Sequence, residues 1–208
     1  FTSNRVFGMA CLSMVLAYSS SFSVSFLLSF YLQYIAGDSP DTAGLMLVVT
    51  AACMVVVTPF AGRLSDKHPP RWLASSGLTL NAMGLFLLAR LDGGQSISHI
   101  VTAQVLIGIG FGLFSAPNSN RIMSSVSTQY VGQASASIPT MRGIGNLTSM
   151  SIVTGIFAAY LGSAMITPEN TGALMNGISL SFSIISVLAV LGAATSMIRV
   201  HKASDTAS

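Results

Sequence analysis

The sequence predicts an all-α membrane protein with six transmembrane helices, on three observations. Only 7% of the 208 residues are charged and 51% are hydrophobic, whereas soluble domains carry about 25% charged residues. The mean hydropathy is +0.71. Six uncharged stretches each reach the roughly 18–20 residues that cross about 30 Å of hydrocarbon as a helix. These stretches are residues 6–37, 42–62, 72–89, 93–120, 143–168 and 170–198.

The basic residues predict how the helices are threaded, because orientation depends on Lys and Arg in short loops. With the N-terminus inside, eight of the nine Lys and Arg residues lie on the cytoplasmic side and only Arg90 lies outside. The reverse threading would place eight cations outside. We therefore expect a multi-pass protein of the plasma (inner) membrane with both termini cytoplasmic. The cytoplasmic cations are Arg5, Arg63, Lys67, Arg71, Arg121, Arg142, Arg199 and Lys202.

The first three helices are delimited by turn residues and charges. The first covers about residues 7–35 and ends at a turn, 37–41, whose Gly, Asp, Ser and Pro residues favour turns. The second is expected over about 42–61 and is followed by a short basic loop, 62–71. The third is expected over about 72–89 and ends before an Asp-Gly-Gly turn.

The last three helices are expected over about 99–123, from a start within 132–142 to near 161, and over about 175–198. A seventh uncharged stretch, residues 122–141, is not a span, because nine of its twenty residues are Ser, Thr or Gln. Nothing divides the chain into soluble domains. We expect one six-helix transmembrane domain, residues 1–198, and a short cytoplasmic tail, 199–208.

Several classes of protein are excluded. The spans carry no His-Glu-x-x-His, no Gly-x-Ser-x-Gly, no paired carboxylates and no Ser/His dyad, so we expect no enzyme activity. An ion channel would need a ring of aligned charges along its pore, and the spans carry none. Cys11 and Cys53 lie within spans and suit apolar packing better than a disulfide or metal site. No cofactor, metal or nucleic acid is expected.

The loop between the second and third helices carries a recognisable motif, Gly62-Arg63-Leu64-Ser65-Asp66-Lys67-His68-Pro69-Pro70-Arg71. Gly62 permits a tight helix exit, and Asp66 can accept hydrogen bonds from the N-terminus of a neighbouring helix. Arg63, Lys67 and Arg71 can hold the loop at an anionic inner leaflet. The loop resembles the cytoplasmic motif of the major facilitator superfamily. The alternative is a basic loop with an incidental Asp.

Further segments support the same resemblance. They are residues 4–7, 31–33, 108–118, 132–135 and 142–145. Together they are similar to the C-terminal six-helix half of the fourteen-span drug:proton antiporters, the EmrB/QacA-like branch. Three positions depart from the pattern: Ala136 replaces a common Gly, Pro139 replaces a usual Asn, and the Pro-Pro pair at 69–70 replaces a Gly-basic pair.

The resemblance implies one half of a transporter, built from two inverted three-helix repeats, that rocks against an N-terminal six-helix half. Helices 1 and 4 would line the cavity, 2 and 5 would face the partner half, and 3 and 6 would face lipid. The implied function is secondary active export of amphipathic or aromatic small molecules. No acidic residue lies inside a span, so protons would be coupled through the other half. The alternatives are half of a sugar or metabolite porter and a non-transporting membrane scaffold.

The first helix carries a candidate substrate face. Its aromatic and polar residues are spaced by four, three, four and four positions and therefore share one side of a helix. With Gln104 of the fourth helix, they form the predicted cavity lining. Alternatively, the serines bond to their own helix and the larger side chains reach other helices. The face comprises Tyr18, Phe22, Ser25, Ser29 and Gln33.

The fourth and fifth helices carry the remaining candidates. Gly108 and Gly112 predict close packing, Pro117 predicts a kink, and Asn118 can bond across helices. Arg142 has two alternatives. A fifth helix that starts near Gly132 would place it about 15 Å along the span and require a partner, whereas a start near Pro139 would let it reach the surface. We expect it near the inner gate.

Overall fold

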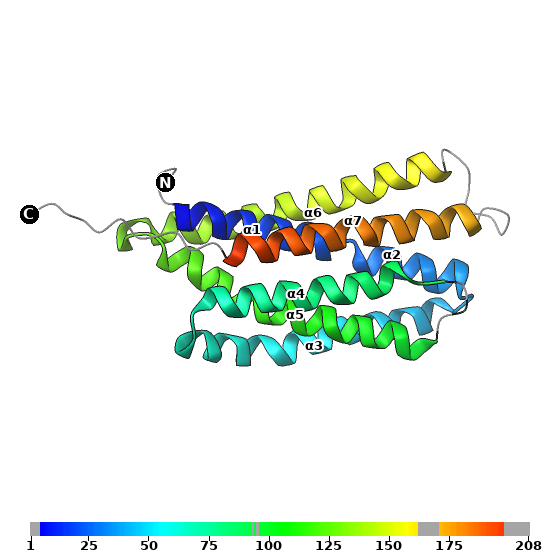
Figure 1. Ribbon diagram of the computed structural model, residues 1–208, viewed down its shortest axis with the longest axis horizontal. Helices are drawn as coiled ribbons and strands as arrows, with labels where there is room; N and C mark the ends of the chain where they lie inside the picture. Colours follow the sequence, from blue (N-terminus) through cyan, green and yellow to red (C-terminus); the bar gives the residue numbers. More distant parts are fainter. Residues whose placement is uncertain (1–4, 93, 95, 162–170, 198–208) are drawn as a thin grey trace, which may run out of the picture.

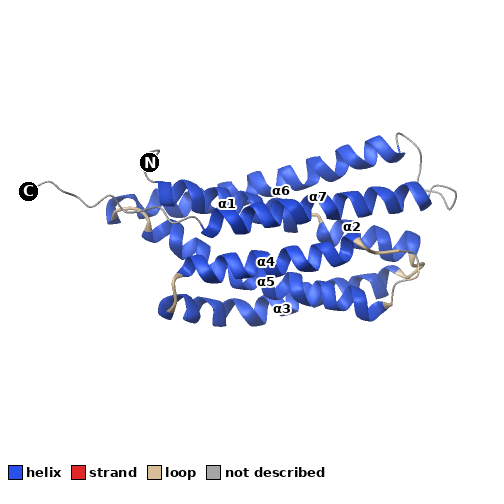
Figure 2. Ribbon diagram, in the orientation of Figure 1, coloured by secondary structure: helices blue, strands red, loops and turns tan. Residues whose placement is uncertain are grey.

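The chain folds into a bundle of long helices, and the part of it that the structure describes contains no strand. The computed structural model describes residues 5–92, 94, 96–161 and 171–197, apart from the side chain of Asp66. The helices run along the long axis of the molecule (Figures 1 and 2). Within the described residues, six spans are long and apolar enough to cross a membrane. The predicted all-α, six-helix membrane fold is confirmed.

The first span consists of three helical pieces: α1 (Arg5–Ser21), α2 (Val24–Phe30) and the π-helical turn η1 (Tyr31–Ile35). Gly37, with φ of +76°, ends it in a left-handed conformation that glycine adopts at little cost. The other spans are α3 (Pro40–Lys67), α4 (Pro70–Ala89), α5 (Ile97–Ser124), α6 (Val131–Leu161), which follows the short turn η2 (Thr128–Tyr130), and α7 (Thr171–Met197). The predicted tail, 199–208, lies outside the described residues.

The basic loop predicted at 62–71 is much shorter in the structure. Helix α3 continues through Gly62 to Lys67, and only His68 and Pro69 separate it from α4. The two prolines explain this end point, because proline disfavours helical geometry in the residue before it. His68 is accordingly extended, with φ −125° and ψ 150°. Gly62 is therefore not the helix exit that the sequence predicted.

The contacts between spans show two equivalent groups of three. Helix α3 packs on α5, as α6 packs on α1, and α4 packs on α5, as α7 packs on α1. Helices α4 and α7 contact each other, and so do α1 and α5. Exchanging the first three spans for the last three leaves this set of contacts unchanged. This is the arrangement of two inverted three-helix repeats that the family resemblance implied.

Serine side chains join α4 and α7 along their length. Ser75 donates to the Ala193 carbonyl at 3.2 Å, Ser186 to Ala82 at 3.1 Å, and Ser179 to Ala89 at 2.7 Å. Successive bonds are seven residues apart on both antiparallel helices. Because a serine hydroxyl in an apolar bundle needs an acceptor, these bonds set the register of the two helices.

The six spans differ in how far the bundle covers them. In the most apolar stretch of each span, between 50% and 61% of residues are buried for the first span, α4, α5 and α7, but only 6% for α3 and 17% for α6. Helices α3 and α6 form opposite edges of the bundle in Figure 1. Each therefore has a broad face that the described part of the chain leaves uncovered.

Most of the described cations gather at one end of the bundle, whereas Arg142, which the threading also assigned to the cytoplasmic side, lies within α6. Helix α1 begins, α7 ends and α3 joins α4 at one end of the bundle, while α4 joins α5 at the other (Figure 1). Arg90 lies at the second end. Arg5, Arg63, Lys67, Arg71 and Arg121 belong to the first end, and Arg199 and Lys202 lie outside the described residues.

Candidate functional site

Polar side chains from two other helices support the interruption of the first span. The regular helix stops at Phe22 and Ser23, where the Ser23 N–H donates to Ser149 Oγ of α6 at 3.2 Å. The Ser23 and Ser149 hydroxyls are 2.7 Å apart, and Asn81 Nδ2 of α4 donates to Ser21 Oγ at 3.2 Å. Interrupted helices are tolerated within a membrane only where neighbours satisfy the freed backbone groups. Ser149 supplies such a bond here.

Next to this interruption, Arg142 of α6 lies against two aromatic rings. Because α6 begins at Val131, Arg142 is roughly 16 Å along the helix. Its guanidinium carbon is 5.3 Å from the centroid of the Tyr18 ring, and Tyr18 meets Phe111 of α5 edge-on at 5.0 Å. The structure thus has the earlier of the two helix starts considered for Arg142, and it gives the cation an aromatic partner.

The Arg142 side chain retains hydrogen-bonding capacity. Its Nε is buried and has no hydrogen-bond partner within the described part of the chain. The same is true of Asn146 Oδ1, one turn further along α6, and of Ser19 Oγ on α1. Buried polar atoms normally have partners. The surface between α1 and α6 can therefore bind further polar groups, such as water or a polar group of a ligand.

The predicted face of the first span is divided by the interruption. Tyr18 lies on one side of it, between α5 and α6, as described above. Phe22, at the interruption, is 50% exposed, and Ser25 is also exposed. Beyond it, Gln33 Nε2 donates to Ser29 Oγ at 2.7 Å. Among the described residues of this face, Gln33 and Ser29 are the pair that a hydrogen bond joins.

Gln104 belongs to a different interface from the other predicted cavity residues. It is fully buried on α5, where its Oε1 accepts a hydrogen bond of 3.1 Å from Thr50 Oγ1 of α3. Its Nε2 is buried without a partner among the described atoms. No hydrogen bond joins it to the face of the first span in the described residues. Gln104 thus contributes an unsatisfied donor between α3 and α5.

An aromatic cluster that sequence reasoning missed lies beyond the interruption. Phe26 and Phe30 are 4.5 Å apart between ring centroids, and Phe30 is 5.5 Å from Tyr34. Phe157 of α6 contacts Phe26 at 6.1 Å and Phe30 at 5.9 Å. The sequence spacing could have predicted this cluster, because its aromatic residues on the first span repeat every four positions. Phe26, Phe30 and Tyr34 each follow a residue of the predicted polar face by one position.

The loop-motif residues occupy the ends of α3 and α4. Arg63 and Lys67 are exposed in the last turns of α3, and the Asp66 side chain lies outside the described atoms. Arg71 lies in the first turn of α4, with its guanidinium carbon 5.9 Å from the Trp72 ring centroid. These cations therefore stand at the membrane surface end of the bundle rather than in its interior.

The glycine candidates of α5 pack against α3, and Asn118 joins α5 to α1. A Cβ at Gly108 would lie 2.5 Å from the Thr50 carbonyl of α3, and one at Gly112 would lie 3.0 Å from Val57. Pro117 lies inside α5, which continues to Ser124. Asn118 Nδ2 donates to the Ala10 carbonyl at 3.0 Å and joins α5 to α1.

Comparison with known proteins gives one family match and several relatives. The family model described as Major Facilitator Superfamily matches residues 10–207. The riboflavin transporter RibZ of Clostridioides difficile is 30% identical over 165 residues, 79% of this chain and 34% of that protein. The uncharacterized transporter YebQ of Escherichia coli is 31% identical over 173 residues, 83% of this chain and 35% of that protein.

A third relative is an efflux pump. The multidrug efflux pump LfrA of Mycolicibacterium smegmatis is 27% identical over 158 residues, 74% of this chain and 31% of that protein. The chain thus spans about a third of the length of these relatives. With the six-helix bundle and the family match over nearly all its residues, the chain belongs to the Major Facilitator Superfamily, a family of membrane transporters.

Proposed function

We propose that this chain is the C-terminal half of a secondary active exporter of drugs or other small molecules. It works with a six-helix N-terminal half in the plasma membrane by rocker-switch alternating access. One six-helix transmembrane domain, residues 1–198, and a cytoplasmic tail, 199–208, make up the half. Both termini face the cytoplasm, because this threading keeps the cations gathered at one end of the bundle inside.

The uncovered faces of α3 and α6 carry this proposal. Only 6% and 17% of their apolar stretches are buried, although both helices belong to the same bundle as four well-covered spans. Helix α6 also exposes small residues, Gly155 and Ala159, that would let another helix approach closely. A second six-helix half would cover these faces and enclose a cavity against α1 and α5.

The proposed substrate is an amphipathic or aromatic small molecule. Tyr18 lies beside Arg142 and packs edge-on against the buried Phe111. Phe22, four residues further along the first span, offers an exposed aromatic ring. The unpartnered Nε of Arg142 and Oδ1 of Asn146 offer a few polar contacts. Cavities that combine apolar walls with few polar groups suit such ligands.

Protons are the proposed coupling ion, and their carrier is placed in the N-terminal half. The described acidic residues, Asp38, Asp41, Asp66 and Asp92, lie at helix ends or in loops, and Glu169 and Asp205 lie outside the described residues. Proton coupling needs a titratable group that is reachable from both sides in turn. This half does not supply one among its described residues.

A metabolite porter is the second candidate function. It is supported by the relative that is a riboflavin transporter, since riboflavin is itself an aromatic molecule. The two candidates differ in substrate rather than in mechanism.

Transport assays in proteoliposomes test the proposal. The chain alone should give no substrate-driven proton flux, whereas the chain with its N-terminal half should give flux with amphipathic or aromatic drugs. Flux with riboflavin but not with drugs would favour the metabolite porter. Robust flux from the chain alone would contradict the proposal that the N-terminal half carries the protons. The absence of flux from both preparations would favour a membrane scaffold.

A further inference from the structure

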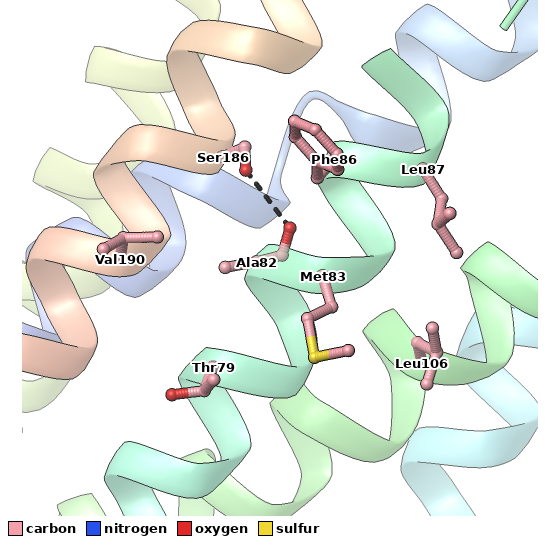
Figure 3. A pocket seen from close by; sticks show the side chains of 8 residues that line it. All are labelled: Thr79, Ala82, Met83, Phe86, Leu87, Leu106, Ser186 and Val190. Carbon is pink, nitrogen blue, oxygen red and sulfur yellow. Dashed lines mark hydrogen bonds between the residues drawn. The ribbon is translucent and has the colours of Figure 1, made fainter. Parts of the chain in front are cut away.

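A groove opens on the outer surface of the bundle between α4, α5 and α7 (Figure 3). Its volume is about 350 Å³, and its walls include Met83 and Phe86 of α4, Leu106 of α5 and Val190 of α7. Met83, Phe86 and Val190 are 55%, 51% and 55% exposed. The described residues therefore leave the groove open to the surroundings of the bundle.

The groove offers almost no free polar group. Its two hydroxyls are already bonded to backbone carbonyls, Thr79 to Ser75 at 3.0 Å and Ser186 to Ala82 at 3.1 Å, the latter shown by the dashed line in Figure 3. A water-soluble ligand would lose hydrogen bonds to water there without replacing them. A hydrocarbon chain loses none.

A positive charge lies at one end of the groove. Arg90 follows the last residue of α4, and its guanidinium carbon is 4.8 Å from the centroid of the Phe86 ring, which lines the groove. No ion pair of Arg90 is present among the described residues. The nearby Asp92 carboxylate accepts the Gly94 N–H at 3.1 Å.

The depth of the groove matches one leaflet of a bilayer. Its α4 wall extends from Thr79 to Leu87, a rise of about 12 Å, and the hydrocarbon of one leaflet is about 15 Å thick, half of the full core. Arg90 lies three residues beyond Leu87, roughly 4.5 Å further along the helix axis, so a headgroup above an acyl chain in the groove would lie at its level. The apolar wall is thus followed by a cation along α4, just as the acyl chain of a phospholipid is followed by its phosphate.

We propose that this groove binds an acyl chain of an anionic phospholipid whose phosphate is held by Arg90. A guanidinium can donate two parallel hydrogen bonds to phosphate oxygens. A zwitterionic headgroup would bring its own cation close to Arg90, so anionic lipids are favoured. The site lies in the leaflet next to the α4–α5 connection, whichever side of the membrane that is, and it does not depend on the proposed transport function.

Tryptophan quenching by brominated lipids tests this binding site. The chain has one tryptophan, Trp72, at the opposite end of α4, so Trp72→Phe removes the background signal. Met83→Trp then places a reporter in the groove, and Val190→Trp is a second reporter on the opposite wall. Val48→Trp on α3, where Val48 is 56% exposed and faces lipid when this chain alone is reconstituted, is the matched control outside the groove. Quenching is compared in bilayers of brominated phosphatidylglycerol and brominated phosphatidylcholine.

Both groove reporters should show a preference for phosphatidylglycerol of about fivefold, the effect of one cation beside an anionic headgroup. The preference should vanish with Arg90→Gln and persist in part with Arg90→Lys, while the Val48→Trp control shows none. Circular dichroism establishes that each variant is folded. Equal preference at groove and control positions, or a preference that survives Arg90→Gln, would mean ordinary surrounding lipid and overturn the proposal.

Discussion

Arg142 is the residue whose position is hardest to explain by folding alone. Arg142 is the twelfth of the 31 residues of α6, and a cation within a span costs up to about 2.5–3.5 kcal/mol on insertion scales. Its cation–π contact with the Tyr18 ring, whose centroid is 5.3 Å away, stabilises the charge by about 0.5–2 kcal/mol. The contact therefore offsets part of that cost. A role in transport, at the proposed inner gate facing the other half, would account for the residue.

Arg142→Ala should therefore impair transport by roughly tenfold or more in the complete transporter while leaving its amount in the membrane nearly unchanged. Tyr18→Phe, which keeps the aromatic ring, should retain most activity. Gln133→Ala, an exposed change in the first turn of α6, serves as the control. Drug efflux from cells and immunoblots of membranes measure the two quantities. Equal losses of transport and abundance in Arg142→Ala would assign the residue a structural role instead.

At the scale of elements, sequence reasoning placed most helices well because uncharged length is a strong signal. It ended the second helix at Gly62, since charges begin there, but charged residues can extend a helix beyond the membrane. The Pro69–Pro70 pair was the better signal, because proline acts on the backbone itself. The interruption at Ser23 contains neither Gly nor Pro. It depends on Ser149, 126 residues away, which no local pattern can predict.

Close packing of α4 on α5 predicts a large difference between two glycines. A Cβ at Gly110 would lie 2.5 Å from the Gly77 carbonyl and 2.5 Å from the Asn81 nitrogen, whereas a Cβ at Gly155 meets nothing within 4 Å. Gly110→Ala should cost about 1–3 kcal/mol of unfolding free energy, because the helices must separate. Gly155→Ala should stay within about 0.5 kcal/mol of the parent chain. Thermal unfolding in detergent compares the two.

Similar losses for both glycine variants would show that the α4–α5 contact is not the source of the effect. A neutral Gly110→Ala would show that α4 and α5 can move apart freely.

The hydrogen bond across the helix interruption can be measured by a double-mutant cycle. Ser23→Ala, Ser149→Ala and the double variant should show a coupling energy of about 0.6 kcal/mol, the average for hydrogen bonds between membrane helices. Reversible unfolding in mixed micelles gives the four free energies. Strictly additive single effects would mean that the 2.7 Å contact between the two hydroxyls contributes nothing to stability.

At the scale of the whole molecule, the two repeats use equivalent helices for equivalent tasks. Helices α4 and α7 contact each other through the three serine hydrogen bonds and leave one apolar face outward, where the lipid groove lies. Helices α1 and α5 also contact each other and meet near Arg142. Helices α3 and α6 remain at the edges with uncovered faces. Within this half, α4 and α7 are well buried, whereas α3 and α6 are left for a second half to cover.

The same plan requires the two ends of every span to lie on opposite sides of the membrane, and labelling of α5 tests which side is which. In a Cys11→Ser/Cys53→Ser background, Ser98→Cys and Ser124→Cys place single exposed thiols near the two ends of α5. Ser98→Cys should react with a membrane-impermeant maleimide in intact cells. Ser124→Cys should react only after the cells are opened, because its end of the bundle carries the cations that stay in the cytoplasm. The reverse result would place Arg63, Lys67 and Arg71 outside and overturn the proposed orientation, and labelling of both thiols in intact cells would show that α5 does not cross the membrane.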